Sequence, residues 1–204
     1  MEAVNSEPQV LEGEMNSPVE APTAKEILQK SMYDILQMFD DPTREGLKET
    51  PRRWAKAMQE LLNGHTFNMT TFDAEGYSQM VVQEDISFFT FCEHHVLPFF
   101  GHAIIGYIPN KKMVGLSKLA RTVTHFSRRL QVQERMTEQI AAFLQEELEP
   151  VGVGVILRAR HLCQEMRGIE KVGAHTTTSC LKGEFLAPGV REEFMRLSEK
   201  HRGG

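Results

Sequence analysis

The order of the predicted strands and helices is the feature that most restricts the fold of this chain. β-Branched and aromatic residues are frequent in residues 79–91 and 102–110, which predicts two successive strands. Apolar residues then recur at helical spacing from residue 117, most clearly over 132–148. Two further strands are predicted at 151–163 and 173–186. Strands in adjacent pairs favour antiparallel pairing, so we predict an α+β fold with helices on one sheet face. The other face and the sheet edges need cover, which oligomerisation would supply.

Two helices are predicted before the first strand. The run Thr23–Glu26 has the spacing of a capping box, and the helical pattern that follows ends near Pro42. A second helix begins at Thr50, with Pro51 at its first position, and stops at Gly64. We therefore expect residues 23–64 to form an N-terminal helical segment.

The net charge of −5 comes from the N-terminus. Residues 1–22 carry five glutamates and no Lys or Arg, and the remaining 23 acidic residues balance 23 basic ones. Such a leader has little apolar surface to bury, so we predict that it is disordered. The neutral body argues against a nucleic-acid partner. The sequence also has no apolar run long enough for a membrane span and no secretory signal, so we expect a cytoplasmic location and no membrane partner.

Two short motifs combine cysteine and histidine. One is Cys92-Glu93-His94-His95, and the other is His161-Leu162-Cys163 at the end of a predicted strand. Alternation along a strand places His161 and Cys163 on the same face. Thiolate and imidazole are the ligands that zinc prefers, so the two motifs predict a zinc site. Cys180 is the third cysteine, and we interpret it as a packed thiol.

The spacing leaves the type of zinc site open. Four protein ligands would make a closed structural site, whereas three would leave a position for water and allow catalysis. A single CxxH motif also occurs by chance, and a buried cysteine often only fills the core. We interpret His102 and His125 as ordinary histidines.

Several longer segments resemble GTP cyclohydrolase I. They are CEHHVLPFFGHAIIGYIP, GLSKLARTV, FSRRLQVQERMTEQIA, HLCQEMRGI and TTTSC, in the family's order. The similarity extends from the Thr50–Arg53 segment to Phe194. It implies a tunnelling fold, in which four-stranded antiparallel sheets from several subunits join into a barrel with helices outside. It also implies a decamer of two pentamers, with active sites between subunits. Residues 65–204 would then form the catalytic domain.

The resemblance also implies roles for individual residues. The matching zinc ligands are Cys92, His95 and Cys163. The matching catalytic residues are His94, His161 and Ser117. Glu134 matches the carboxylate that binds guanine, and Gln133 beside it is a further substrate contact. The matching triphosphate contacts are Lys118, Arg121 and Arg167, with Arg53 and Lys56 contributed by an adjacent subunit.

The implied reaction is hydrolytic opening of the imidazole ring of GTP. Carbon 8 leaves as formate, the ribose rearranges with help from Ser117, and the ring closes to 7,8-dihydroneopterin triphosphate. Zinc would lower the pKa of bound water from about 15.7 to about 7, and histidine titrates near working pH. Whether His94 or His161 protonates the ring stays open.

Three alternatives compete with this assignment. A binding module with a closed zinc site would lose its fold when His94 is replaced. A nitrile reductase of the same fold uses a cysteine nucleophile and NADPH, and it has no reason to carry both CEHH and HLC. A degenerate family member would bind pterin without catalysis, although this chain has every catalytic residue type.

Overall fold

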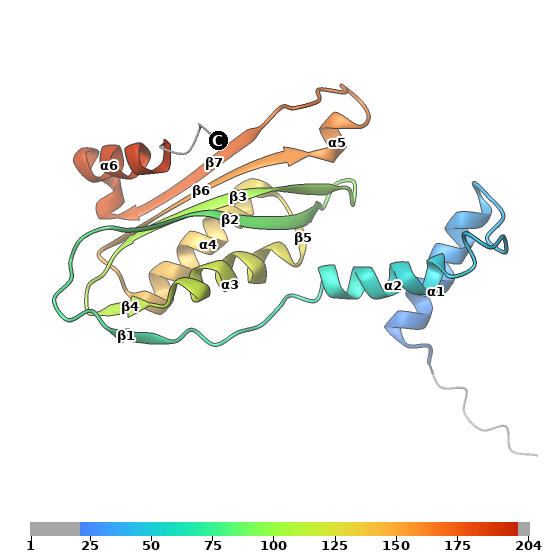
Figure 1. Cartoon of the computed structure of the whole chain (residues 1–204), viewed down its shortest axis with the longest axis horizontal. Helices are drawn as coiled ribbons and strands as arrows, with labels where there is room; N and C mark the ends of the chain where they lie inside the picture. The colour runs from blue at the N-terminus through green and yellow to red at the C-terminus, as the bar shows by residue number, and fades with distance from the viewer. Residues whose placement is uncertain (1–20, 200–204) are drawn as a thin grey trace, which may run out of the picture. The chain divides into compact units, whose positions relative to one another are not determined.

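The computed structural model describes residues 21–199 (Figure 1). The chain separates into two compact units, one ending at Lys56 and the other beginning at Ala57. The leader that we predict to be disordered is residues 1–22. Residues 1–20 of it lie outside the described part of the chain. The predicted domain boundaries after residues 22 and 64 stay predictions. Within residues 21–199, no helix is both long and apolar enough to cross a bilayer.

The first unit contains helix α1 (Ala24–Gln37) and the start of α2 (Thr50–Leu61). The predicted capping box is confirmed: the Glu26 amide donates to the Thr23 hydroxyl, and the Glu26 carboxylate accepts from the Thr23 amide at 2.8 Å. These bonds satisfy amides that the first helical turn otherwise leaves without partners.

The second unit is built on a sheet with strand order β5-β2-β3-β6-β7. Its four long strands are antiparallel: β2 (Val81–Cys92), β3 (Pro98–Ile108), β6 (Gly152–His161) and β7 (Thr176–Gly183). Strand β5 (Leu130–Gln131) pairs in parallel with β2, so the sheet has one strand more than predicted. A strand of two residues is too short to show the alternation of apolar and polar residues by which a strand is predicted. A separate pair joins β1 (Thr71–Asp73) to β4 (Lys112–Val114).

One face of this sheet is covered by helices α3 (Leu116–Ser127) and α4 (Gln133–Leu148) (Figure 1). The apolar side of α4 meets alternate residues of β3 and β6, which gives the main hydrophobic core. Ile140 on α4, Ile105 on β3 and Leu157 on β6 are all fully buried there. The apolar faces that the helical and strand periodicities predict therefore pack against each other in one core.

The opposite face is also partly covered, which corrects the prediction of helices on one face only. The 3-10 helix η1 (Glu184–Leu186) and helix α6 (Pro188–Glu199) pack there (Figure 1). The smaller core that they form contains the buried residues Ile104, Ile156, Phe185 and Phe194. Gly106 and Gly154 leave room on the strands for these two phenylalanine rings.

Candidate metal centre and active site

The turn between β2 and β3 carries the first cysteine and histidine motif. Cys92 ends β2, its amide donates to the Leu97 carbonyl at 2.9 Å, and its carbonyl accepts from the Val96 amide at 2.8 Å. Val96 has a φ of 51°, a left-handed conformation that tightens the turn. The tight turn brings the side chains of Cys92 and His95 together.

Cys163 reaches the same place from a different element than predicted. Strand β6 ends at His161, and Cys163 lies in the one-turn helix α5 (Leu162–Glu165). The predicted shared strand face for His161 and Cys163 is therefore wrong, because the helical turn redirects the Cys163 side chain. Since His161 pairs with Phe99 near the start of β3, α5 begins beside the turn that holds Cys92.

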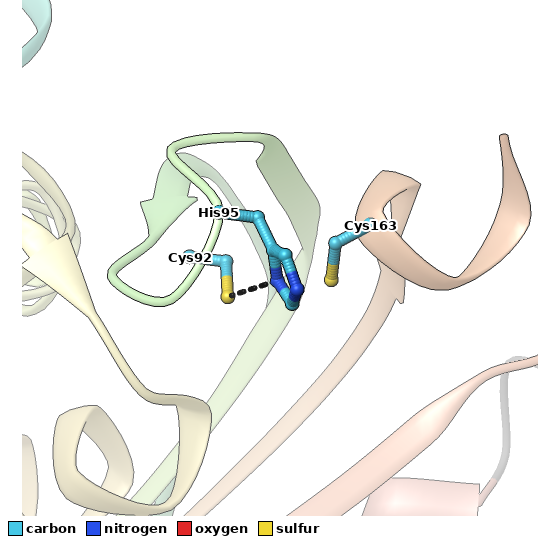
Figure 2. A group of neighbouring side chains, drawn as sticks. All are labelled: Cys92, His95 and Cys163. Carbon is cyan, nitrogen blue, oxygen red and sulfur yellow. Dashed lines mark hydrogen bonds between the residues drawn. The ribbon is translucent and has the colours of Figure 1, made fainter. Parts of the chain in front are cut away.

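Three ligand atoms converge at this point. The Sγ atoms of Cys92 and Cys163 and a ring nitrogen of His95 all lie within 4.8 Å of one another, and Figure 2 shows the three side chains pointing toward one another. The distance from Cys92 Sγ to His95 Nδ1 is 3.8 Å. Tetrahedral sulfur and nitrogen ligands of zinc lie about 3.6 Å apart. The donor types and their spacing therefore fit a zinc ion.

The electrostatics of the thiols favour a cation between them. Burial raises the pKa of the Cys163 thiol, and the neighbouring Cys92 thiol raises it further. Two thiolates this close oppose one another's ionisation, and a divalent cation offsets that repulsion.

His161 lies beside this group and is held on two sides. Its ring stacks on Phe99, with ring centres 4.5 Å apart and planes 7° from parallel. Its Nε2 atom lies 2.7 Å from Gln133 Oε1. Burial lowers the pKa of His161, and the Glu134 carboxylate opposes this effect. The neutral imidazole is thus favoured in the free chain.

A cavity of about 160 Å³ joins these groups. It is lined by Cys92, His94, His95, Phe99, Gln131, Val132, Gln133, Glu134, His161 and Cys163. It therefore includes the expected ligands, both expected catalytic histidines, the expected guanine contact Glu134 and the further expected substrate contact Gln133. Ligand pockets usually exceed about 300 Å³, so this cavity suits a ring system rather than a whole nucleotide.

The remaining predicted residues lie elsewhere. Ser117, Lys118 and Arg121 lie on α3, and none of them lines this cavity in the described part of the chain. Lys118 Nζ donates to the Asn68 carbonyl at 2.6 Å. Arg167 follows α5, and its charge partly offsets the rise in the pKa of Cys163 that burial and Cys92 cause. Arg53 and Lys56 lie on α2 in the first unit.

One supporting contact was not predicted. Arg135 on α4 forms an ion pair with Glu93, and the Glu93 amide donates to the Gln131 carbonyl at 3.0 Å. These bonds hold the turn that carries Cys92 against the start of α4. No local pattern links Glu93 with Arg135, because the two residues lie 42 positions apart.

Known proteins resemble this chain over most of its length. A model of the GTP cyclohydrolase I family matches residues 28–199. A GTP cyclohydrolase 1 of Aquifex aeolicus (strain VF5) is 54% identical over 160 residues, which cover 78% of this chain and 87% of the relative. One from Porphyromonas gingivalis is 49% identical over 182 residues, which cover 86% and 94%.

Among solved structures, an archaeosine synthase QueF-Like in the apo form matches with 12% identity and a TM-score of 0.43, covering 51% of this chain and 93% of that one. This likeness is too weak to carry an argument. The sequence relatives, by contrast, match along nearly their whole length, and they confirm the resemblance. The chain belongs to the GTP cyclohydrolase I family.

Proposed function

We propose that this chain catalyses the reaction of its family, the hydrolytic opening of the imidazole ring of GTP. The products are formate and 7,8-dihydroneopterin triphosphate. The observation that carries this proposal is the convergence of two thiols and an imidazole in a cavity that also contains His94, His161 and Glu134.

Zinc is the metal that we propose for the three ligands. Cys92, His95 and Cys163 would hold it, and the donor set of two thiolates and one imidazole suits zinc better than magnesium or calcium. When bound by three protein ligands, zinc lowers the pKa of a water ligand toward about 7. His94 lies outside the three-residue group, which supports an open rather than a closed site.

The two histidines would carry the proton transfers. His161 is favoured as neutral by burial and can accept a proton near the reacting ring. The Nδ1 atom of His94 lies 3.6 Å from Cys92 Sγ, so this imidazole also lies beside the proposed metal site. Either group can act as a base and then, once protonated, as an acid.

Substrate binding would use residues from the cavity and beyond it. We propose that Glu134, in the first turn of α4, accepts hydrogen bonds from the guanine ring N–H and NH2 groups. Lys118, Arg121, Arg167, Arg53 and Lys56 are proposed triphosphate contacts. Ser117 is proposed to assist the ribose rearrangement.

The active oligomer is proposed to be a decamer in which sheets join edge to edge. Strand β7 has a sheet neighbour on one side only in the described chain, so its other edge can pair with a second copy. The small cavity supports sites completed between subunits, because the ribose and triphosphate need contacts beyond it. A cytoplasmic location stays a prediction.

The direct test is incubation of the zinc-loaded protein with GTP. We expect formate in equal amount to GTP consumed and a pterin that fluoresces after oxidation. ATP should give neither product, because it lacks the donors that Glu134 recognises. A zinc-loaded oligomer that releases no formate from GTP would refute the proposed function.

A further inference from the structure

Gln133 is a buried polar residue whose hydrogen bonds define the chemistry of its neighbour. It is the first residue of α4 and is only 1% exposed. We propose that Gln133 is a positioning residue that fixes the tautomer of His161, so that His161 presents Nδ1 to the substrate. The catalytic part of this inference rests on the proposed function, whereas the tautomer itself does not.

The surroundings of Gln133 determine which way its amide faces. Its Nε2 lies 3.1 Å from each of two backbone carbonyls, those of Leu157 and Thr176. Carbonyl oxygens can only accept hydrogen bonds, so the group that faces them must be the NH2. The reversed amide would place an oxygen against two oxygens in a buried site, which is strongly unfavourable.

Two threonine hydroxyl groups complete the network and require the same orientation of the Gln133 amide. Thr137 Oγ1 donates to the backbone carbonyl of Gln133 at 2.8 Å, and this bond uses the only proton of the Thr137 hydroxyl. Thr178 Oγ1 therefore donates to Thr137 Oγ1 at 2.6 Å and accepts from Gln133 Nε2 at 3.1 Å. Every donor in the set has an acceptor only when the NH2 of Gln133 faces the sheet.

This orientation decides which nitrogen of His161 carries a proton. Gln133 Oε1 can only accept, and His161 Nε2 lies 2.7 Å from it, so Nε2 must donate. A neutral imidazole has one N–H, which leaves Nδ1 with its lone pair. No hydrogen-bond partner for His161 Nδ1 is found among residues 21–199. Nδ1 is therefore the ring nitrogen whose lone pair can face a group of the substrate.

Gln133 thereby takes a different role from the predicted substrate contact. Both of its N–H groups are committed to the sheet, so it has no donor left for the guanine ring. Its effect on the reaction would pass through His161, whose ring is also held in plane by Phe99. Partners that fix the proton and orientation of a metal-bound histidine are typically worth about 10- to 100-fold in metal affinity or activity, and we expect an effect of this order for Gln133 on His161.

The test combines a spectroscopic and a kinetic measurement on the zinc-loaded full chain. Solid-state NMR of protein with 15N-labelled histidine reports which ring nitrogen is protonated, and the His161 signals are those lost in His161→Ala. The kinetic variants are Gln133→Met, which removes the acceptor, and Thr178→Val, which removes a network partner but leaves the contact with His161. If Gln133→Met does not fold, the NMR measurement on the wild-type protein still decides which nitrogen of His161 carries the proton.

We expect wild-type His161 to be protonated at Nε2 and bare at Nδ1. In Gln133→Met the pattern should be lost, and kcat should fall on the order of 10- to 100-fold with KM for GTP nearly unchanged. Thr178→Val should keep the wild-type kcat and tautomer.

Two results would overturn the inference: a wild-type His161 protonated at Nδ1, or an unchanged kcat in Gln133→Met, whether KM stays the same or rises. A raised KM with unchanged kcat would make Gln133 a direct substrate contact. A wild-type enzyme that releases no formate would instead contradict the proposed function, while the NMR result on the tautomer would still stand.

Discussion

Cys163 and Cys180 are both partly buried thiols, but their neighbours differ. Cys163 lies within ligand distance of Cys92 and His95. Cys180 on β7 donates instead to the Glu138 carboxylate at 2.8 Å. The same residue type is thus a proposed metal ligand in one place and a packed thiol in the other.

Cys163→Ser should therefore abolish zinc retention and GTP turnover together, because a serine hydroxyl is a poor ligand for zinc at neutral pH. Cys180→Ser is the matched control and should retain about one zinc per chain, measured by metal analysis after gel filtration. Full zinc content in Cys163→Ser would contradict the assignment of this ligand.

Cys180 should also resist alkylation. Burial, followed by the hydrogen bond to Glu138, raises the pKa of Cys180 to about 11. A raised thiol pKa keeps the unreactive protonated form, so at pH 8 only about 0.1% is thiolate, and iodoacetamide should react about 100-fold more slowly than with free cysteine. Mass spectrometry should show the rate rising toward pH 11. Glu138→Gln should speed the reaction at pH 8, since it removes the carboxylate charge that opposes ionisation.

At the scale of elements, the sequence predicts features that lie within one long segment. It does not predict the contacts that very short helices and strands make. The capping box of α1 and the apolar stripe of α4 each lie within one segment of sequence. Strand β5 has two residues and α5 has four, too few for a period to appear. The packing of α6 depends on the space that Gly106 and Gly154 leave on β3 and β6. No pattern within the sequence of α6 predicts that space.

Gly154→Ala tests that packing. A Cβ at this position would lie 2.5 Å from Phe185 and 2.8 Å from Phe194, so we expect unfolding free energy to fall by about 1–3 kcal/mol through overpacking. Gly189→Ala in α6 is the control, because nothing lies within 4 Å of its added Cβ. This helical substitution should be neutral or stabilising by up to about 1 kcal/mol. Equal denaturant midpoints for the two variants would contradict the described packing.

At the scale of the whole molecule, the candidate site joins residues that the sequence separates. Cys92 and Cys163 come together because β3 and β6 are adjacent in the sheet, and the two motifs predict this pair from the sequence alone. The hydrogen-bond network of Gln133 could not be predicted, since it depends on the carbonyls that β6 and the start of β7 present to α4. The proposed triphosphate contacts do not line the cavity of this site.

Mixed oligomers test whether sites lie between subunits. His161→Ala and Arg53→Ala should each lose most activity alone, the first through the lost acid–base group and the second through a lost triphosphate contact. Co-expression with two affinity tags yields mixed oligomers. If Arg53 serves a neighbouring subunit, random pairing should restore about one quarter of wild-type turnover. Mixed oligomers no more active than the two variants alone would place both residues in the same chain's site.

The most direct measurement of the central claim is GTP turnover as a function of bound zinc. Protein stripped with a chelator is reloaded in steps, and formate release is measured with zinc content in the same samples. Turnover should rise in proportion to zinc and reach its maximum at about one ion per chain. Full turnover in the stripped protein would contradict a zinc-dependent site built from Cys92, His95 and Cys163.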